Sequence, residues 1–557
     1  MQNSRPQFVL KFLPSMADFA FLMPILFLFC RMEGMKTLFS DCDAGWHIRT
    51  GEWILANHRV PTTDIFSYSK PDGAWYAWEW LSDVIWALLR AHGGLAAVGL
   101  VALTMICFTY VLLYKLVLRR SNAIVAVLLT LTAAVSSSVH WLARPHLFTL
   151  VFVVLYYHAL ERVREGRTSW RGIPYLAMLP AATILWTNLH GGFFVGIIMI
   201  GAYGAGELLK AVLTPNSDER GPALHRAGAY IATSLACLAA SLVNPYTYKL
   251  HKHVVEYLLD PYQSQHIVEF LSVNFHHPLA IFFEAMLLIS TIAAVRYAGK
   301  GEYIQPLLIA MWAHAALLSI RNVPIFMLIA APPAAADVQL WLARLPETNI
   351  AAWLRRAAAK FNSVAADLTE TDAVGRYHLV SIAAILFVAA LVTAPHPPAS
   401  FRPEFSPKTF PVKAAATLAA DPTAHIFTSD QWGDYLIFSL YPRTRVFTDG
   451  RSDYYGAEFG QKYLDVLNVN VGWEKTLARF GVDTVLISPS SPLCGALKES
   501  PHWRVVYDDG VAVVFRPAGK AAAKPVSVAN GGGETRDREI TKTQASDLRI
   551  ATNKTKT

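Results

Sequence analysis

The chain consists of long apolar runs separated by shorter polar segments. Runs of about 20 residues recur along it, and each is long enough to cross a bilayer core of roughly 30 Å. We expect membrane-spanning helices at about residues 13–31, 93–114, 121–140, 145–161, 173–187, 191–210, 227–243, 279–296, 303–320, 323–341 and 378–395. The pattern therefore predicts an α-helical polytopic membrane protein with about eleven spans.

Composition and charge agree with a membrane protein. Of the 557 residues, 54% are hydrophobic and only 16% are charged, whereas about a quarter of the residues of a soluble domain are charged. The net charge is +8, but Lys and Arg gather in short segments between the apolar runs, as in proteins whose membrane helices they orient. This placement argues against a nucleic-acid partner. The five cysteines show no paired spacing, so neither a disulfide framework nor a zinc site is expected.

The distribution of cations also predicts the topology. With the N-terminus in the cytoplasm, most cationic segments, such as Arg119–Arg120 and 162–171, fall in cytoplasmic loops. The positive-inside rule therefore favours a cytoplasmic N-terminus and an extracytoplasmic C-terminus. The first apolar run ends near Cys30 without a small-residue cleavage site, so we expect an uncleaved first helix.

Three regions are expected. Residues 1–397 form a transmembrane domain with a structured first outer loop, 32–92, whose end, YAWEWLSDVIWALLRAHGG, suits a helix on the membrane surface. Residues 398–517 alternate short β-branched runs with turn residues around a helical pattern at 457–480, and they end in a hairpin pattern, WRVVYDDGVAVVFRP. They predict a small extracytoplasmic α/β domain. Residues 518–557, rich in Ala, Lys, Gly and Thr, predict a disordered tail.

Polar and aromatic residues gather in the first outer loop, in DCDAGWHIRTGEWI from residue 41. The carboxylates of Asp41 and Asp43 can bind a divalent cation such as Mg²⁺ or Mn²⁺, or take a proton from an attacking hydroxyl. A helix that begins near Asp43 would keep both carboxylates ionised at its positive end and place His47 on the same face. The simpler alternatives are that one aspartate only caps the helix and that Cys42 is a passive spacer.

Several segments together resemble the GT-C superfamily of membrane glycosyltransferases, which includes protein O-mannosyltransferases and the aminoarabinose transferases of lipid A. They are DCDAGWHIRTGEWILANHRVPTTDIFSYS, WEWLSDVI, HWLARPHLFT, NLHGGFFVG, VNPYT, RNVPIF and DQWGDYLI. The resemblance is to a bacterial branch and covers nearly all of residues 15–517. The acidic pair departs from the Asp-Glu form of some relatives, which leaves the metal requirement open.

The resemblance implies an enzyme of the bacterial cytoplasmic (inner) membrane. It would move a hexosyl or pentosyl group, with inversion, from a polyprenyl-phosphate-linked donor to a lipid, glycan or protein acceptor of the cell envelope. Asp43 would be the general base or a metal ligand, and Asp41 the supporting carboxylate. The rival hypothesis is a non-catalytic lipid-sugar binding protein, a flippase or an envelope scaffold. A transporter would place its charges near the bilayer midplane, whereas here they gather at the outer ends of spans.

Cations at the predicted outer face are candidates for binding the donor phosphate. Arg144 and His146 lie in HWLARPHLF, Arg321 lies in SIRNVPIF, and Lys249 lies in the second long outer loop, 244–278. An Arg fork can hold phosphate oxygens bidentately. The alternative is that an interfacial cation only extends toward lipid headgroups.

The remaining expected residues would line the substrate cavity. They are Trp46, His47, Arg49, Glu79, Asn188 and His190. A single histidine such as His190 is also compatible with a structural role. For Trp432, Asp434, Asp449 and Arg451 of the outer domain, a structural role is favoured over sugar binding.

Overall fold

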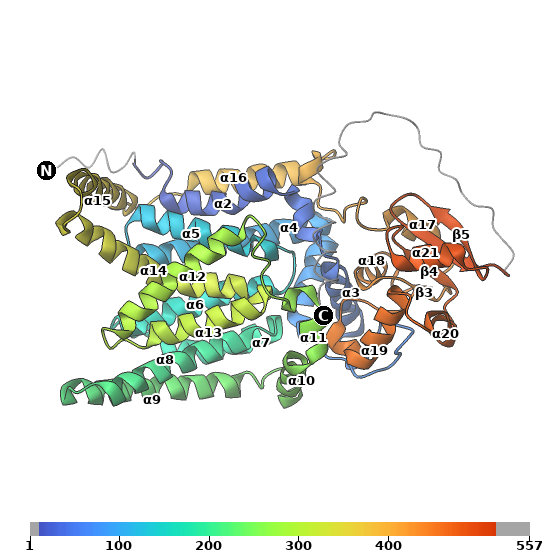
Figure 1. Ribbon diagram of the computed structural model, residues 1–557, viewed down its shortest axis with the longest axis horizontal. Helices are drawn as coiled ribbons and strands as arrows, with labels where there is room; N and C mark the ends of the chain where they lie inside the picture. The colour runs from blue at the N-terminus through green and yellow to red at the C-terminus, as the bar shows by residue number, and fades with distance from the viewer. Residues whose placement is uncertain (1–9, 520–557) are drawn as a thin grey trace.

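The chain folds as a helical bundle with a small α/β domain packed at one end. The computed structural model describes residues 10–519. In Figure 1 the bundle lies on one side and the C-terminal domain on the other, with α3 (Asp43–Asn57) between them. Helix α2 (Met16–Arg31), the first of the bundle, runs toward the C-terminal domain. Most of the predicted tail, residues 520–557, lies outside the described residues.

A helix covers each of the predicted apolar runs. The bundle helices are α2, α4 (Trp80–Leu118), α5 (Ala123–Ser137), α6 (His146–Arg164), α7 (Tyr175–Leu189), α8 (Phe193–Leu213), α9 (Ser217–Ala240), α12 (Ala280–Ala298), α13 (Ile304–Leu318), α14 (Val323–Arg344) and α16 (Leu379–Val392). Within residues 10–519, six helical segments are long and apolar enough to cross a membrane, and α7, α13 and α16 are shorter apolar helices. The structure thus confirms a mostly helical chain with several candidate spans, while the count of eleven stays a prediction.

Local sequence explains how these helices begin and bend. Ser15 caps α2 in a capping box: its hydroxyl accepts the N–H of Asp18, and the Asp18 carboxylate accepts the N–H of Ser15. In α4 the backbone leaves helical geometry at Gly93 and at Gly94, whose φ is +63°. Glycine adopts this conformation without a Cβ clash. The predicted surface helix is therefore the first part of α4, joined by a glycine kink to the second span.

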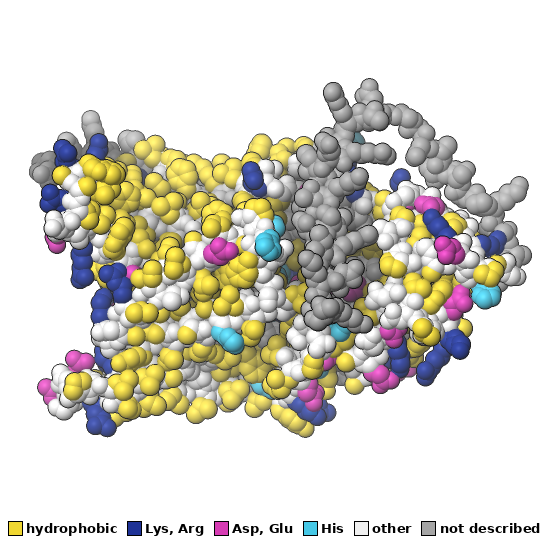
Figure 2. All heavy atoms as spheres, in the orientation of Figure 1, with side chains coloured by type: hydrophobic (Ala, Val, Ile, Leu, Met, Phe, Trp, Pro, Cys, Tyr) yellow, Lys and Arg dark blue, Asp and Glu magenta, His cyan; other side chains and the backbone are white. Residues whose placement is uncertain are grey.

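The surface of the bundle separates apolar from basic residues. Figure 2 shows a broad hydrophobic surface over the helices and Lys and Arg side chains gathered at the end away from the C-terminal domain. Basic residues occupy the last turns of helices that end there, including Arg162 and Arg164 of α6, Lys210 of α8 and Arg344 of α14. This distribution is consistent with a cytoplasmic location of that end, which stays a prediction.

Short helices connect the spans at both ends of the bundle. On the side of the C-terminal domain are η1 (Gly34–Phe39), η2 (Ser138–His140), α10 (Tyr248–Leu259), α11 (Pro261–His266), η3 (Val268–Phe270), η4 (Ile320–Asn322) and η6 (Ala399–Phe401). At the opposite end are the β1–β2 hairpin (Ser169–Trp170, Ile173–Pro174), η5 (Leu345–Glu347) and α15 (Ala352–Asp372).

The C-terminal domain is built on a four-stranded sheet of order β3-β4-β6-β5. The strands are β3 (Ile426–Phe427), β4 (Thr484–Ile487), β5 (Trp503–Asp508) and β6 (Val513–Pro517), and only β3 and β4 pair in parallel. Around it lie α17 (Val412–Leu418), α18 (Asp430–Leu440), α19 (Ser452–Leu467), α20 (Trp473–Arg479) and α21 (Pro492–Glu499). The hairpin pattern is found as β5–β6.

Two local expectations for this domain differ from the structure. The stretch DQWGDYLIFSL forms helix α18, because its apolar residues Tyr435, Leu436 and Ile437 are buried against the rest of the molecule. The helical pattern at 457–480 is divided: α19 ends at Leu467, and Gly472, with a φ of +91° that glycine adopts readily, is the N-cap of α20.

The first outer loop and the C-terminal domain form one packed unit. Ser67 pairs in parallel with Val446, which in turn bridges Ile426 of β3. The loop thus extends the sheet of a domain that follows it by hundreds of residues in the sequence. Helix α3 also packs on α18, where Arg49 Nε donates to the carbonyl oxygen of Phe438 at 2.8 Å. This packing places the first-loop aspartates between the bundle and the C-terminal domain.

Candidate active site

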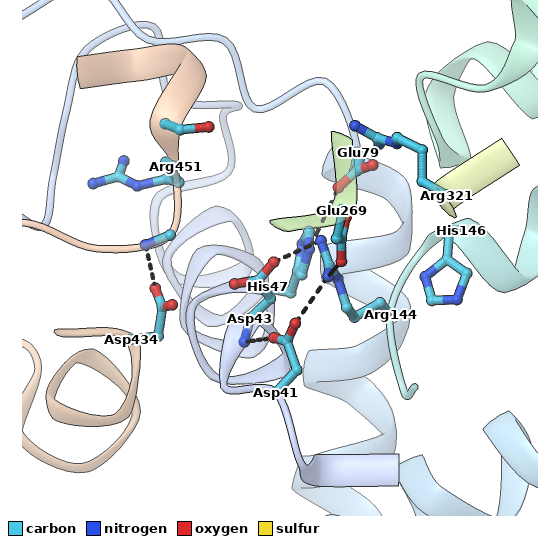
Figure 3. A network of polar contacts seen from close by, with 12 residues as sticks. Asp41, Asp43, His47, Glu79, Arg144, His146, Glu269, Arg321, Asp434 and Arg451 are labelled. Atoms are coloured by element: carbon cyan, nitrogen blue, oxygen red, sulfur yellow. Dashed lines mark hydrogen bonds and ion pairs between the residues drawn. The ribbon is translucent and has the colours of Figure 1, made fainter. Parts of the chain in front are cut away.

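Arg144 is the centre of a cluster of three carboxylates. Its Nη1 lies 2.9 Å from Asp41 Oδ2 and 2.6 Å from Glu269 Oε1, and its Nη2 lies 2.6 Å from Asp43 Oδ2. The arginine comes from the hairpin between α5 and α6, the aspartates from the start of α3, and Glu269 from η3. Figure 3 shows these side chains converging from separate elements. The structure therefore brings two predicted sites, the acidic pair and Arg144, into direct contact.

Two of the three carboxyls beside Arg144, those of Asp43 and Glu269, respond to it differently. Burial raises the pKa of Asp43 above its usual range; Arg144 opposes this, and the charges of Asp41 and Glu269 add to it. Burial also acts to raise the pKa of Glu269, but the charges of Arg144 and Arg321 outweigh it and hold that pKa well below its usual range. We expected Asp43 to stay ionised at the helix N-terminus; its burial instead favours the protonated form.

The acidic pair is not arranged as a metal site. Asp41 Oδ1 accepts the backbone N–H of Asp43 at 2.7 Å, and the other oxygen of Asp41 and Oδ2 of Asp43 face the Arg144 guanidinium. A cation would compete with that guanidinium for the same oxygens. Within residues 10–519, no group of three or more His, Cys, Asp or Glu residues is placed to hold a metal ion. The predicted binding of a divalent metal by Asp41 and Asp43 does not fit this geometry.

Asp43 also meets an aspartate of the C-terminal domain. A Cβ added at Gly450 would lie 2.5 Å from Asp43 Oδ1 and 2.7 Å from Asp434 Oδ2, so both oxygens crowd the same glycine. Both are buried and have no hydrogen-bond partner in the described structure, while Asp434 Oδ1 accepts the N–H of Gly450 at 2.9 Å. Two buried carboxyls this close are stabilised when one keeps a proton. Asp434 therefore belongs to the surroundings of the acidic pair.

Glu79 lies between two histidines. Its Oε1 is 3.2 Å from His190 Nε2, and its Oε2 is 3.4 Å from His47 Nε2. His47 Nδ1 in turn lies 2.6 Å from Asp83 Oδ1. Burial is the main cause that raises the pKa of Glu79 to about 8, with Arg144 opposing it. The predicted cavity residues Glu79, His47 and His190 thus form one connected array.

Arg321 is placed differently from Arg144. Its Nη1 lies 3.4 Å from the Tyr257 hydroxyl, and its guanidinium carbon lies 4.5 Å from the centre of the Phe270 ring. In the described part of the chain, Arg321 forms no ion pair with a carboxylate. The one hydrogen bond of its guanidinium there is the 3.4 Å contact with the neutral hydroxyl of Tyr257. Arg321 is half-buried, and a cation that is partly removed from water without a paired carboxylate is costly. The arrangement leaves Arg321 able to bind an anion.

These groups meet at one end of a cavity of about 730 Å³. The residues at its polar end are Glu79, His140, Arg144, His146, His190, Glu269 and Arg321. The rest of the wall is mostly apolar and comes largely from the bundle, with Leu150, Phe194, Ile198, Met311, Trp312 and Ile325, and it also includes His314. The volume is typical of a ligand-binding pocket. The cavity can hold a ligand with an apolar part among the helices and an anionic part beside the arginines.

Not every predicted residue lines this cavity. Asp41, Asp43 and His47 lie behind its wall. Trp46 packs over the His47 ring, with ring centres 3.6 Å apart, and Arg49 binds α18. Asn188 accepts the indole N–H of Trp80 at 2.7 Å and donates to the carbonyl oxygen of Val243 at 2.8 Å, which is a structural role.

Lys249 lies in a second, smaller hollow of about 230 Å³. The residues around it are Tyr76, Tyr248, Lys252, His253 and Glu256. Its contact with the donor phosphate stays a prediction, since α10 places Lys249 at this smaller hollow, apart from the cavity that Arg144 and Arg321 line. His146 lines the cavity, but its Nε2 lies 2.7 Å from the His140 carbonyl oxygen.

Two acidic residues of the site were missed from the sequence. Glu269 stands in HIVEFL of the second outer loop, and Asp83 stands in WEWLSDVI. Asp434, in DQWGDYLI, was considered, but a structural role was favoured for it. Glu269 and Asp83 are single acids in unremarkable surroundings. Only their positions, in the second long outer loop and in the segment expected to lie on the membrane surface, could have drawn attention to them.

Comparisons with known proteins were made with the sequence and with the fold. No family model and no curated protein matches the chain. Two solved structures are similar, each at 12% identity and a TM-score of 0.48: the archaeal oligosaccharyltransferase AglB from Archaeoglobus fulgidus, and a structure described as the Archaeoglobus fulgidus oligosaccharyltransferase. The complex with an inhibitory peptide and a dolichol-phosphate aligns over 85% of this chain and 69% of its own, and the complex with Zn and sulfate over 90% and 73%. This degree of similarity does not assign the chain to a family.

Proposed function

We propose that the protein is a membrane glycosyltransferase that moves a sugar from a polyprenyl-phosphate-linked donor to an envelope acceptor at the outer face of the membrane. The observation that carries the proposal is Arg321, a cation without a carboxylate partner among the described residues, at the polar end of an apolar-walled cavity. A polyprenyl phosphate has the matching chemistry, since its chain is apolar and its headgroup is an anion.

In the proposed reaction the acceptor oxygen attacks the anomeric carbon directly and inverts its configuration. The new bond is between that oxygen and the anomeric carbon, and the bond that breaks joins the carbon to the phosphate oxygen. The electron pair stays on the lipid phosphate, and the proton of the acceptor goes to a carboxylate of the site. Because negative charge grows on the phosphate, a fixed cation beside it stabilises the transition state more than the bound donor.

The two arginines have different parts in this proposal. Arg144 is surrounded by three carboxylates at 2.6–2.9 Å, so its charge is largely compensated before any ligand binds. Arg321 is the main phosphate-binding group, and Arg144 holds Glu269 and the acidic pair in place. Both arginines were candidates from the sequence, and their different contacts favour Arg321 as the phosphate-binding group.

The rival candidate is a flippase or a scaffold that binds a lipid-linked sugar without chemistry, and the same cavity could serve either of these functions. A flippase requires polar groups along a path through the bilayer. Here most of the ionisable lining residues gather at one end of the cavity, with His314 of α13 as an exception, and the wall between the helices is mostly apolar. This asymmetry supports chemistry at one face over transport.

Lipid binding tests the donor site directly. Purified protein in nanodiscs would be titrated with undecaprenyl phosphate, and with undecaprenol as a lipid of equal chain length without the anion. We expect the phosphate to bind more tightly than the alcohol, and Arg321→Ala to weaken phosphate binding about 10- to 100-fold. Arg321→Lys should recover only part of this, because it keeps the charge and loses the fork. Equal binding of both lipids would remove the proposed donor class.

Chemistry is tested separately from binding. The same protein would be given radiolabelled undecaprenyl phosphate glucose, mannose or galactose, with cell-envelope extract as the acceptor. Release of undecaprenyl phosphate with label in the envelope fraction supports transfer. Tight binding with no release from any of these donors favours the flippase or scaffold, and the envelope glycans of a deletion strain would then show which sugar is missing.

A further inference from the structure

Glu79 is the carboxylate of the cavity whose two oxygens each face an imidazole. It stands just before α4, is 9% exposed and contributes to the polar end of the cavity. His190 comes from the break between α7 and α8, and His47 from α3. Glu79 thus joins the cavity to a buried side chain of the first outer loop.

The hydrogen bonds around His190 determine where its proton is. The backbone N–H of Gly192 points to His190 Nδ1 at 3.0 Å, and an N–H can only donate, so Nδ1 is unprotonated. The Thr149 hydroxyl, 2.7 Å away, donates to the same nitrogen and accepts the indole N–H of Trp186 at 2.9 Å. The ring proton is therefore on Nε2, from which it is directed to Glu79 Oε1.

The other side of Glu79 requires a mobile proton. His47 has a carboxylate at each nitrogen, Asp83 at 2.6 Å and Glu79 at 3.4 Å. A neutral ring has one N–H and cannot donate to both. Burial and the charge of Arg144 lower the pKa of His47 well below its usual range, which favours the neutral ring. The array then needs one carboxyl proton, on Asp83 or on Glu79.

Asp43, which the sequence favoured as the base, is in a different position. It does not line the cavity: one oxygen is held by Arg144 at 2.6 Å, and the other is buried beside Gly450. An acceptor hydroxyl in the cavity would meet Glu79 before it met Asp43. Glu269, the other carboxylate of the lining, is held as a strongly ionised anion by Arg144 and is a poor proton acceptor.

We infer that Glu79 takes the proton of the acceptor hydroxyl in the cavity, and that His47 and Asp83 act behind it as positioning residues that receive and hold protons. The inference rests on the proposed function. In the step, the acceptor oxygen bonds to the anomeric carbon, the bond from that carbon to the phosphate oxygen breaks, and the acceptor proton moves to Glu79. The carboxylate must be unprotonated when the acceptor arrives, so its proton passes to the His47–Asp83 side or to solvent between turnovers.

Several charged groups act on Glu79 besides the histidines. They are Arg144 of the α5–α6 hairpin, Arg321 of η4, Asp43 of α3 and Asp453 of α19. Turnover should accordingly rise with pH up to about 8, where the Glu79 carboxylate forms, and level off above it.

The first test compares Glu79→Gln with wild type in the transfer assay. We expect turnover to fall about 100-fold or more, with undecaprenyl phosphate bound to within about twofold of wild type, because the amide keeps the shape and removes the base. Glu458→Gln, at an exposed position of α19, is the matched control and should change neither quantity. Full turnover by a folded Glu79→Gln protein would overturn the inference. Equal binding of undecaprenyl phosphate and undecaprenol by the wild-type protein would instead overturn the proposed function.

His47→Gln tests the positioning role. It should leave lipid-phosphate binding intact and shift the pH at which turnover reaches half of its maximum, an effect that a merely structural residue would not produce. An unchanged pH profile with reduced turnover would contradict the relay.

The second measurement needs no substrate. A carboxyl whose pKa is raised in the folded protein adds stability below its ordinary pKa of 4.5, and that stability is lost as pH rises to about 8. The thermal midpoint of wild type should therefore fall relative to that of Glu79→Gln over this window. Parallel midpoints at every pH would show that the proton of the array is not on Glu79 and would overturn the predicted rise of turnover up to a pH of about 8.

Discussion

The guanidinium of Arg451, in the C-terminal domain, lies 2.8 Å from the carboxylate of Asp64, in the first outer loop. Both side chains are buried. A second carboxylate, Asp449, lies 2.7 Å from the same guanidinium, and the ring centres of Trp75 and Phe66 lie 4.5 and 4.9 Å from its central carbon. This contact holds together the two segments that flank the acidic pair. The structural role favoured for Arg451 from the sequence agrees with its burial.

Arg451→Ala should destabilise the protein strongly. Removing one partner of a buried ion pair leaves Asp64 and Asp449 without a counter-charge, a loss of about 3–5 kcal/mol. The control is Arg516→Ala, which breaks a 2.7 Å pair with Asp421 at a partly exposed site, where the expected loss is below about 1 kcal/mol. The measurement is the thermal midpoint of each variant in the same detergent. Equal losses of stability in the two variants would show that burial does not strengthen the Arg451 ion pair.

Gly51→Ala should separate α3 from α4. A Cβ at Gly51 would lie 2.0 Å from the Asp83 carbonyl oxygen, so one backbone would have to move. Because Asp83 orients His47, we expect both a lower thermal midpoint and a lower turnover. Gly228→Ala is the matched change: it lies on an exposed part of α9 with open space around its Cβ, and Ala there should stabilise the helix by about 0.5–1 kcal/mol.

Lys249→Ala should leave the binding of undecaprenyl phosphate unchanged. The lysine belongs to the small hollow beside α10, whereas the arginines line the large cavity. The titration with undecaprenyl phosphate, run beside Arg321→Ala, measures the difference. A loss of affinity in Lys249→Ala as large as that in Arg321→Ala would extend the donor site to α10.

Glu269→Gln should make the protein less sensitive to acid. Arg144 and Arg321 depress the pKa of Glu269, so this carboxylate adds stability above its ordinary pKa of 4.5, and the contribution is lost as the pH falls below that value. Wild type should be the more stable protein near neutral pH, and the two thermal midpoints should approach each other in acid. A constant difference from neutral to acidic pH would contradict the ion-pair account of Glu269.

Much of the helical bundle could be predicted, because lipid requires long apolar runs with internally satisfied backbones. The acidic pair could also be found, since Asp41 and Asp43 stand together in one short segment. For Arg144 the sequence could predict only that it lies at the same membrane face as the acidic pair. The positive-inside rule assigns loops to sides of the membrane and gives no distances between residues.

The remaining parts of the site depend on packing that no local pattern encodes. Glu79 and His47 are distant in sequence and meet because α3 packs on α4 at Gly51. The surroundings of Lys249 could not be predicted, because a loop position does not fix the direction of a side chain, which here follows from the start of α10. Helix α18 was missed since its aromatic and apolar run is compatible with a strand until burial against α3 decides.

The pairing of Ser67 with Val446 has a consequence for biosynthesis. A ribosome completes the first outer loop on the order of tens of seconds before it reaches the residues that pair with it. During that interval Asp64 has no Arg451, and Asp43 lacks the wall that Asp434 and Gly450 provide. The early helices can insert into the membrane while the site is still incomplete. Assembly of the site is therefore deferred until the last domain has been translated, so a prematurely terminated chain would occupy the membrane without gaining activity.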